Sequence, residues 1–349
     1  MPEWKGTSSV PMEAAMERVK FYIDKFTSNS LEGTRTGAVL RDVTGSSGKM
    51  VRPRLLLLCS AFGMEAKERF ESLCMYAAMV EMTHMASLIH DDIVDEAAYR
   101  RGQLSIQKKY GKDAAVYAGD FLISRVNYRL ALECRNDVSA LLSKTIEEMC
   151  IGEIGQAMYR YDQEMTVDRY LSNIKGKTAA LFKAACTIGA MESGCDQETV
   201  ELLRQLGEYI GIIFQLRDDL MDFIYDASVL GKETHKDFLD GIYTMPVLMA
   251  KQTLSGGNLL TELFRKNARK EITESDLVLM EEIVREEGGI RATIARIHNY
   301  TSVCRELLNT MMDRDIPRRA PWDDEQDFHD QKMQSVRMIK RMLDKFDEV

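Results

Sequence analysis

The sequence is poor in residues that interrupt helices. It has only 6 prolines among 349 residues. By contrast, it has 22 methionines and many Leu, Ala, Glu and Lys residues. Straight-chain side chains of this kind lose little rotamer freedom in a helix, so they favour helix over strand. The hydrophobic content of 45% is enough for a real core. We therefore expect an all-α chain with a well-packed interior.

Paired cysteines, excess basic charge and long apolar runs are also missing. The seven cysteines are scattered without a CxxC pair, which is typical of a reducing compartment. The chain has 46 basic and 55 acidic residues, so it has no excess of positive charge with which to bind the phosphate backbone of a nucleic acid. Nucleic acid is therefore not an expected partner. Residues 1–10 lack a segment of signal-peptide length, and the most apolar run, 55–62, is too short to span a bilayer. We expect a cytoplasmic protein with at most peripheral membrane contact.

Apolar residues recur at helical spacing along most of the chain, which predicts one bundle built as a single domain, residues 1–349. The Ser/Gly/Thr-rich residues 27–49 predict a loop, and residues 313–330, with two prolines and mixed charge, predict a surface insertion. The predicted helices are residues 11–26, 51–62, 66–95, 113–133, 137–161, 166–191, 197–225, 244–253, 275–287, 290–312 and 331–346.

Two segments, residues 91–95 and 218–222, have the same sequence motif, DDxxD. Each lies at the C-terminal end of an apolar predicted helix. The helix dipole is negative there, so clustered carboxylates cost stability unless a cation compensates. Carboxylates without cysteine suit hard cations, and Mg²⁺ binds one or two carboxylates together with water and phosphate oxygens. A single motif could be a solvated acidic helix end. Two copies favour a clamp for a diphosphate.

Basic residues lie near the first of these segments. Arg100-Arg101-Gly102 follows it, and Gly48-Lys49 with Arg52 lies upstream. The guanidinium group of arginine can donate two parallel hydrogen bonds to phosphate oxygens. A lysine in a glycine-containing loop at the N-terminus of a helix commonly binds an anion. The arginine pair could also be a plain counter-charge for a helix end. Together these groups suffice for two diphosphates.

Two further motifs are ambiguous when each is read alone. A lone histidine such as His84 on an apolar helix is most often a hydrogen-bonded core residue. Glu81-x-x-His84 also matches half of a di-iron bundle site, but no other histidine supplies the second half. Lys177-Thr178 would by itself be ordinary surface.

Taken together, these motifs make the sequence resemble the trans-isoprenyl diphosphate synthases, the polyprenyl synthetase family. The resemblance implies an all-α bundle around a central cavity and chain-elongating prenyltransferase activity. The motifs are, in chain order, Gly48-Lys49-x-x-Arg52-Pro53, Glu81-x-x-His84, His90-Asp91-Asp92-x-x-Asp95, Arg100-Arg101-Gly102, Ala118-Gly119-Asp120, Gly152-Glu153-x-x-Gln156, Lys177-Thr178, Phe214-Gln215-x-x-Asp218-Asp219-x-x-Asp222, Gly231-Lys232 and Thr244-x-Pro246.

The resemblance also implies roles for individual residues. The catalytic residues would be Asp91, Asp95, Lys177 and Asp218. Three Mg²⁺ ions, bound together with the substrate diphosphate, would be held by Asp91, Asp92, Asp95, Asp218 and Asp222, with Asp219 in support. The allylic diphosphate would be bound by Arg100, Lys177, Thr178, Gln215 and Lys232. Isopentenyl diphosphate would be bound by Lys49, Arg52, His84 and Arg101.

The implied chemistry matches what these residues offer. Ionisation of an allylic C–O bond adds charge to the leaving diphosphate, so cations aimed at it stabilise the transition state more than the ground state. The alkene of isopentenyl diphosphate then attacks the allylic cation. Loss of a proton, to the departing diphosphate, leaves a chain that is one unit longer.

Leu104, Gln107 and Ile242 depart from the family pattern and resemble the catalytic subunits of two-component bacterial synthases. The alternatives are therefore a homodimer or a chain that needs a small accessory subunit. A shorter-chain farnesyl or geranylgeranyl synthase also stays open. Terpene cyclases and head-to-head synthases need no Lys49 or Arg52, and non-catalytic relatives typically lose motif aspartates, which this chain keeps.

Product length is predicted from the residues that precede Asp91. A helical turn advances ~5.4 Å, close to one isoprene unit, so Ala86 and Ser87 fall where a growing tail passes the helix. Both are small, and in the family bulky residues there stop growth early, which suggests roughly six to ten units by the helix-rise argument. Ala86→Phe or Ser87→Phe is expected to shorten the product, measured by chromatography of the prenyl chains. An active variant with unchanged product length would contradict this placement.

Overall fold

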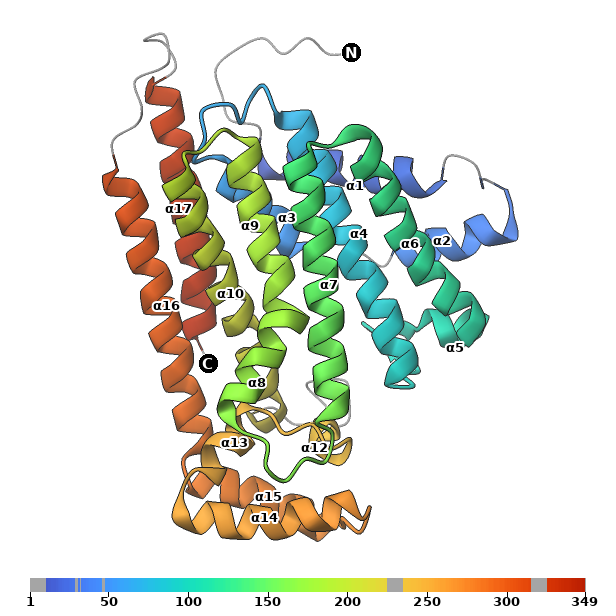
Figure 1. Ribbon diagram of the computed structural model, residues 1–349, viewed down its shortest axis with the longest axis vertical. Helices are drawn as coiled ribbons and strands as arrows, with labels where there is room; N and C mark the ends of the chain where they lie inside the picture. The colour runs from blue at the N-terminus through green and yellow to red at the C-terminus, as the bar shows by residue number, and fades with distance from the viewer. Residues whose placement is uncertain are drawn as a thin grey trace. The chain divides into compact units, whose positions relative to one another are not determined.

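The computed structural model describes residues 11–28, 31, 33–45, 48–224, 235–314 and 325–348. Its elements are α-helical, as predicted, apart from one π-helical turn and one short hairpin (Figure 1). The hairpin pairs β1 (Tyr99–Arg100) with β2 (Gln103–Leu104) in antiparallel fashion. The helices are α1 (Met12–Ser28), α2 (Arg35–Gly45), α3 (Val51–Ser60), α4 (Phe70–Val94), α5 (Ile106–Tyr110), α6 (Lys112–Glu133), α7 (Asn136–Met158), α8 (Val167–Ile174), η1 (Lys175–Ala179), α9 (Ala180–Glu192), α10 (Gln197–Ile224), α12 (Lys236–Leu239), α13 (Met245–Lys251), α14 (Leu254–Ala268), α15 (Glu274–Glu286), α16 (Gly289–Asp313) and α17 (Glu325–Asp347).

The chain divides into two compact units. The first unit comprises Met1–Ile146, Leu181–Gly207 and Thr310–Ile339. The second unit comprises Glu147–Ala180, Glu208–Asn309 and Lys340–Val349. The first Asp-rich motif therefore belongs to the first unit and the second motif to the second unit.

Helix α4 is the core of the first unit. It packs against α1, α3 and α6, and it is buried on almost every face between Leu73 and Ala86 (Figure 1). A helix that is apolar all round has to be covered on all sides, which explains its central position. Asp91 and Asp92 therefore lie at the C-terminal end of a rigid, well-packed helix.

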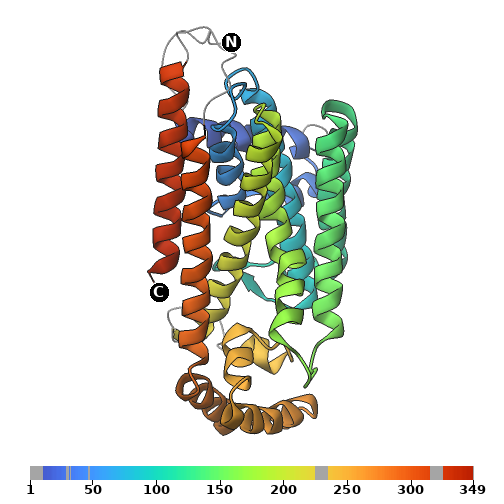
Figure 2. The same cartoon turned by 60° about the vertical axis from the view of Figure 1, so that its left-hand side comes forward.

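In the second unit, α13, α14 and α15 pack on one another (Figure 2). The rings of Tyr243 and Phe264 stack with their centroids 3.7 Å apart, and Phe238 lies beside both. These aromatic rings join the segment before α13 to α12 and α14. Met245, the first residue of α13, is thereby held in place.

The prediction of a loop at residues 27–49 was wrong, because this stretch contains α2. Leu40 and Val43 are buried, and they lie three residues apart on one face of that helix. The Thr34 hydroxyl accepts a hydrogen bond from the Gly37 N–H at 3.0 Å and so caps the first turn. The abundant Ser, Thr and Gly concealed this short apolar pattern.

The predicted helix at residues 166–191 is divided into three elements, since the π-helical turn η1 separates α8 from α9. At this turn the chain crosses α7, and a Cβ at Gly152 would overlap the backbone nitrogen of Lys177. Single π-helical turns inside helices are frequent at functional sites. Lys177 and Thr178 lie within this turn.

Helix α17 begins at Glu325, so residues 325–330, predicted as part of the insertion, are helical. Residues 315–324 lie outside the described residues. The short helices α5 and α12 and the 15-residue helix α14 had no predicted counterpart. None of the described helices combines the length and apolarity that crossing a bilayer requires.

Helices α3 and α9 approach each other closely in the first unit, which generates a stability prediction. A Cβ at Gly189 would overlap the backbone carbonyl of Leu56, which cannot move aside as a side chain would. Gly189→Ala is therefore expected to lower the free energy of unfolding by about 1–3 kcal/mol, measured by urea denaturation. Gly45→Ala is the control, because nothing lies within 4 Å of a Cβ there. Equal stability of the two variants would refute the close approach.

Candidate functional site

The first Asp-rich motif forms the end of α4, and its carboxylates differ in exposure. Asp92 is buried, and its Oδ1 accepts a hydrogen bond from Arg100 Nε at 2.6 Å. Burial raises the pKa of Asp92, and the positive charge of Arg100 opposes that rise. Asp91 is half-buried and Asp95 is exposed. The protein thus compensates the buried carboxylate with its own cation and leaves the other two at the surface of the unit.

The hairpin that follows places the two arginines. Arg100 pairs with Gln103, and the residues between them, Arg101 and Gly102, have φ angles of 52° and 77°. Two residues with positive φ form the type I′ turn that suits a tight hairpin, although a left-handed conformation is uncommon for arginine. A side chain at position 48 would overlap the Arg101 guanidinium. The predicted Gly-Lys loop and Arg101 therefore lie together.

Gln107, which departs from the family pattern, has a structural role. Its side-chain amide donates to the backbone carbonyls of Asp92 and, at 2.9 Å, Ala97. It thereby adds a second donor, beside the Ala97 N–H, to a carbonyl at the C-terminal end of α4. The substitution keeps the end of the motif anchored to α5.

A second feature of the first unit is a group of charged residues beside α4. Arg52 is buried, with its guanidinium 4.3 Å from the centre of the Phe182 ring. Burial lowers the pKa of Arg52 to about 10. Glu81 is also buried, burial raises the pKa of its carboxyl, and its Oε2 has no hydrogen-bond partner among the described residues. The Glu81 carboxyl is therefore a buried hydrogen-bond acceptor near the guanidinium groups of Arg52 and Arg101.

His84 belongs to the same group. Burial, and then the positive charges of Arg52, Arg101 and Arg100, hold the pKa of His84 well below its usual value. The imidazole is therefore neutral near pH 7, where one ring nitrogen carries a proton and can donate a hydrogen bond. Of the four residues predicted to bind isopentenyl diphosphate, Arg52, His84 and Arg101 lie together here. Lys49 is exposed just before α3.

A cavity of about 590 Å³ opens beside these groups, and Glu81, Asp92, Arg100 and Arg101 contribute to its wall. Its other lining residues come from α2, α4, the hairpin and α5. They are Arg41, Asp42, Val43, Gly45, Met85, Leu88, Ile89, Gln103, Leu104, Ser105, Ile106 and Lys109. Charged side chains of both signs thus meet an apolar wall in this cavity.

The second Asp-rich motif, near the end of α10, is also divided between buried and exposed carboxylates. Asp219 is buried, and burial raises its pKa to about 7. Its Oδ2 accepts hydrogen bonds from the Tyr170 hydroxyl and from the Met245 N–H, the latter at 3.3 Å. Asp222 is buried and accepts from the His235 N–H at 2.8 Å, whereas Asp218 is exposed.

The π-helical turn brings three predicted binding residues together in the second unit. The Thr178 hydroxyl donates to Gln215 Oε1 at 2.7 Å, and Gln215 Nε2 donates to Asp219 Oδ1 at 2.9 Å. Lys177 Nζ lies 3.1 Å from Glu153 Oε2 on α7. Thr178 and Gln215 therefore share one network with the second motif, and Lys177, on the same turn as Thr178, pairs with Glu153.

Other predicted residues are placed less completely. Lys232 lies outside the described residues. Ala86 is fully enclosed by protein, whereas Ser87 is half-buried and donates to the His84 carbonyl at 2.9 Å. Within the described part of the chain, no three His, Cys, Asp or Glu side chains converge as a metal-binding group by themselves.

Tyr170, His235 and the contact of Gln107 were missed by sequence reasoning. Tyr170 precedes Lys177 by seven residues in a predicted continuous helix, where it reads as one more apolar position. Only the π-helical turn and the fold of α10 bring it to Asp219.

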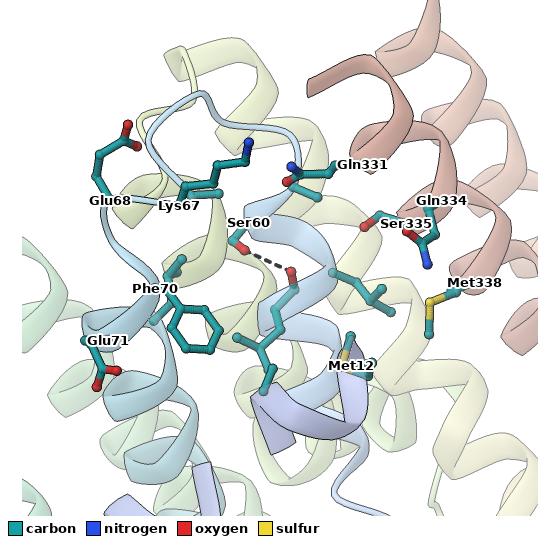
Figure 3. Close-up of a pocket in the computed structure, with 16 residues that line it drawn as sticks. Met12, Ser60, Lys67, Glu68, Phe70, Glu71, Gln331, Gln334, Ser335 and Met338 are labelled. Atoms are coloured by element: carbon teal, nitrogen blue, oxygen red, sulfur yellow. Dashed lines mark hydrogen bonds between the residues drawn. The ribbon is translucent and has the colours of Figure 1, made fainter. Parts of the chain in front are cut away.

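A separate cavity of about 330 Å³ lies in the first unit, lined by residues of α1, α3, the segment before α4, α4 itself and α17 (Figure 3). Figure 3 shows Ser60 on its wall, where the hydroxyl donates to the Leu57 carbonyl at 2.8 Å. Its lining contains none of the predicted site residues.

Comparison with known proteins agrees with the resemblance. The family model described as "Polyprenyl synthetase" matches residues 35–279. "Heptaprenyl diphosphate synthase component 2" of Bacillus subtilis is 34% identical over 266 residues, which are 76% of this chain and 74% of that protein. The crystal structure of a heptaprenyl diphosphate synthase from Staphylococcus aureus superposes with a TM-score of 0.83 at 27% identity, covering 98% of this chain and 99% of the other.

A third relative was solved with ligands. The polyprenyl synthase of Caulobacter crescentus, complexed with calcium and isoprenyl diphosphate, superposes with a TM-score of 0.76 at 27% identity, covering 95% of this chain and 99% of the other. These solved relatives have the all-helical fold that we describe. The fold class and the family resemblance inferred from the sequence are both confirmed.

The environment of His84 predicts a pH dependence of stability. The unfolded chain takes up a proton on this histidine below about pH 6.5, whereas the folded chain resists it. The free energy of unfolding is therefore expected to fall as the pH drops from about 7 to 5.5, and to fall less in His84→Gln. Urea denaturation at a series of pH values measures this. His329→Gln, at an exposed position on α17, is the control and should keep the wild-type dependence. Equal slopes for wild type and His84→Gln would contradict a depressed pKa.

Proposed function

The chain belongs to the polyprenyl synthetase family and is a prenyltransferase, and from this premise we propose that it condenses isopentenyl diphosphate head to tail with an allylic diphosphate. The observation that carries the proposal is the division of carboxylates in both Asp-rich motifs. Asp92, Asp219 and Asp222 are buried and accept hydrogen bonds from the protein itself. Asp95 and Asp218 are exposed, and Asp91 is half-buried. A protein that only needed solvated helix ends would have no reason to bury three of these six carboxylates and to give each a hydrogen-bond donor.

Magnesium is the metal that we propose for this site. An all-carboxylate donor set suits a hard cation that is completed by phosphate oxygens and water. Asp91, Asp95 and Asp218 would supply the direct ligands, and the buried Asp92 and Asp222 would support them within the metal site. When bound, three Mg²⁺ ions would neutralise the charge that builds on the leaving diphosphate.

We assign the residues around the π-helical turn to the allylic diphosphate. Lys177 would contribute positive charge, and Gln215 would donate the second N–H of its amide. Thr178 would bind the diphosphate with its hydroxyl turned away from Gln215 Oε1. The family resemblance assigns Arg100 to the same diphosphate, and its guanidinium has five donors, of which the contact with Asp92 uses only Nε. Lys232 would complete this set. The arrangement would aim cations and donors at the group whose charge increases during ionisation.

Isopentenyl diphosphate would bind at the charged group of the first unit. Arg52, Arg101 and Lys49 would supply the cations, and neutral His84 would donate one hydrogen bond. The apolar surroundings that lower the pKa of Arg52 also strengthen its attraction to a diphosphate, because charges interact more strongly away from water. After condensation the proton would pass to the departing diphosphate.

We propose a product of medium or long chain. The Bacillus relative is named for a heptaprenyl product. Ser87 is half-buried beside His84 and is the better test of the tail's path, because a phenylalanine at the enclosed Ala86 would also disturb packing. Ser87→Ala, which stays small, is the matched control for Ser87→Phe.

The chain's own assembly and location are also proposals. Tyr117, Tyr128 and Leu132 form exposed apolar positions on one side of α6, which suits contact with a second copy or with a small accessory subunit. We favour a homodimer. The name of the Bacillus relative, component 2, keeps an accessory subunit as the alternative. We further propose that residues 1–349 act as one catalytic domain in the cytoplasm, with peripheral membrane contact when the product is released.

The deciding experiment incubates purified chain with Mg²⁺, isopentenyl diphosphate and farnesyl or geranylgeranyl diphosphate. Elongated prenyl diphosphates are expected, and Asp91→Ala and Asp218→Ala should each lose more than about a hundredfold in turnover while keeping helical circular dichroism. Asp113→Ala, an exposed acid in the first turn of α6, is the control and should stay active. If no primer is elongated, with or without a candidate partner subunit, the proposed function is wrong.

A further inference from the structure

The buried carboxylate of the second motif is held by a side chain that belongs to no motif. Tyr170 lies on α8, whose buried face also contains Val167 and Ile174. Its ring is buried, and its hydroxyl donates to Asp219 Oδ2. Hydrogen bonds from a hydroxyl to a carboxylate are among the stronger ones in proteins.

The other oxygen of Asp219 continues the network toward the π-helical turn. Gln215 Nε2 donates to Asp219 Oδ1 at 2.9 Å, and Gln215 Oε1 accepts from the Thr178 hydroxyl at 2.7 Å. Both ends of the Gln215 amide are therefore engaged, so its orientation depends on the carboxylate that Tyr170 holds. The path runs from α8 through α10 to η1, within the second unit.

The network lies in a region where hydrogen bonds cannot easily be replaced. Tyr170, Asp219 and Thr178 are all buried. Loss of one donor to a buried carboxylate costs more than the average hydrogen bond, because water does not take its place. The Met245 N–H, at 3.3 Å, is a longer contact to the same oxygen and is a weak substitute.

We propose that Tyr170 is a positioning residue for the allylic diphosphate. It acts through Asp219 and Gln215, fixing the orientation of the Gln215 amide, whose second N–H would donate to the diphosphate beside Lys177. This inference rests on the proposed function and deepens it. The alternative is that Tyr170 only fills the core and that its hydroxyl is merely satisfied by Asp219.

Tyr170→Phe tests this directly, because it keeps the ring and removes only the hydroxyl. The KM for farnesyl diphosphate is expected to rise about tenfold, in line with the loss of a hydrogen bond to a charged group, while the KM for isopentenyl diphosphate changes less than about twofold. Calorimetric titration of farnesyl diphosphate with Mg²⁺, in the absence of isopentenyl diphosphate, should show the same weakening without turnover.

A matched control exists in the first unit. The Tyr22 hydroxyl also donates to a carboxylate, Glu71 Oε2, at 2.6 Å. Glu71 lies on α4, 20 residues before Asp91, which is roughly 30 Å along the helix. Tyr22→Phe thus removes the same kind of bond and is expected to leave both KM values unchanged.

A double-mutant cycle with Asp219→Asn separates positioning from packing. If Tyr170 acts through Asp219, adding Tyr170→Phe to Asp219→Asn should weaken farnesyl diphosphate binding much less than Tyr170→Phe does alone. Additive effects, equal behaviour of Tyr170→Phe and Tyr22→Phe, or loss of folding in Tyr170→Phe would each overturn the proposal. Failure of the proposed function is a different result, since the wild-type chain would then elongate no primer.

Discussion

Repulsion among clustered carboxylates is the constraint on which the rest of the site depends. Each motif places three aspartates at the C-terminal end of a helix, where the dipole adds further negative charge. The structure reduces this repulsion by burying some aspartates of each motif among hydrogen-bond donors and leaving the others more exposed. Asp92 accepts a hydrogen bond from Arg100, and Asp219 accepts hydrogen bonds from the Tyr170 hydroxyl and the Gln215 amide. The protein itself therefore supplies partners for both buried carboxylates. The more exposed aspartates are then the ones suited to an external cation.

The complementary problem, too much positive charge, is handled in the first unit. Burial, and then the positive charges of Arg52, Arg101 and Arg100, lower the pKa of His84, so this histidine is neutral and adds no further cation. Glu81 provides a buried carboxyl beside Arg52. Burial of these groups is costly before substrate binds, and an incoming diphosphate would relieve that cost. A preorganised anion site of this kind fits a substrate that carries several negative charges.

Much of the fold could be predicted from particular residues. The apolar pattern that leads into Asp91 predicted a long buried helix, and α4 is that helix. Composition predicted an all-α chain, which is confirmed. Helix α2 was missed because Leu40 and Val43 are too few to stand out among Ser, Thr and Gly. The π-helical turn was missed because Lys177 and Thr178 continue an unbroken helical pattern, and only the crossing with Gly152 shows why the turn widens.

The sequence by itself determined the family, the helical class and the identity of the residues that carry charge, because motif spelling and helical period are local properties of the chain. Only the tertiary structure decided which aspartates are buried, which arginine compensates Asp92, and that Tyr170 reaches Asp219. These contacts join residues far apart in sequence, and they depend on burial, which changes both the cost of a charge and its pKa. The physical roles within each motif therefore became distinct only once the chain was folded.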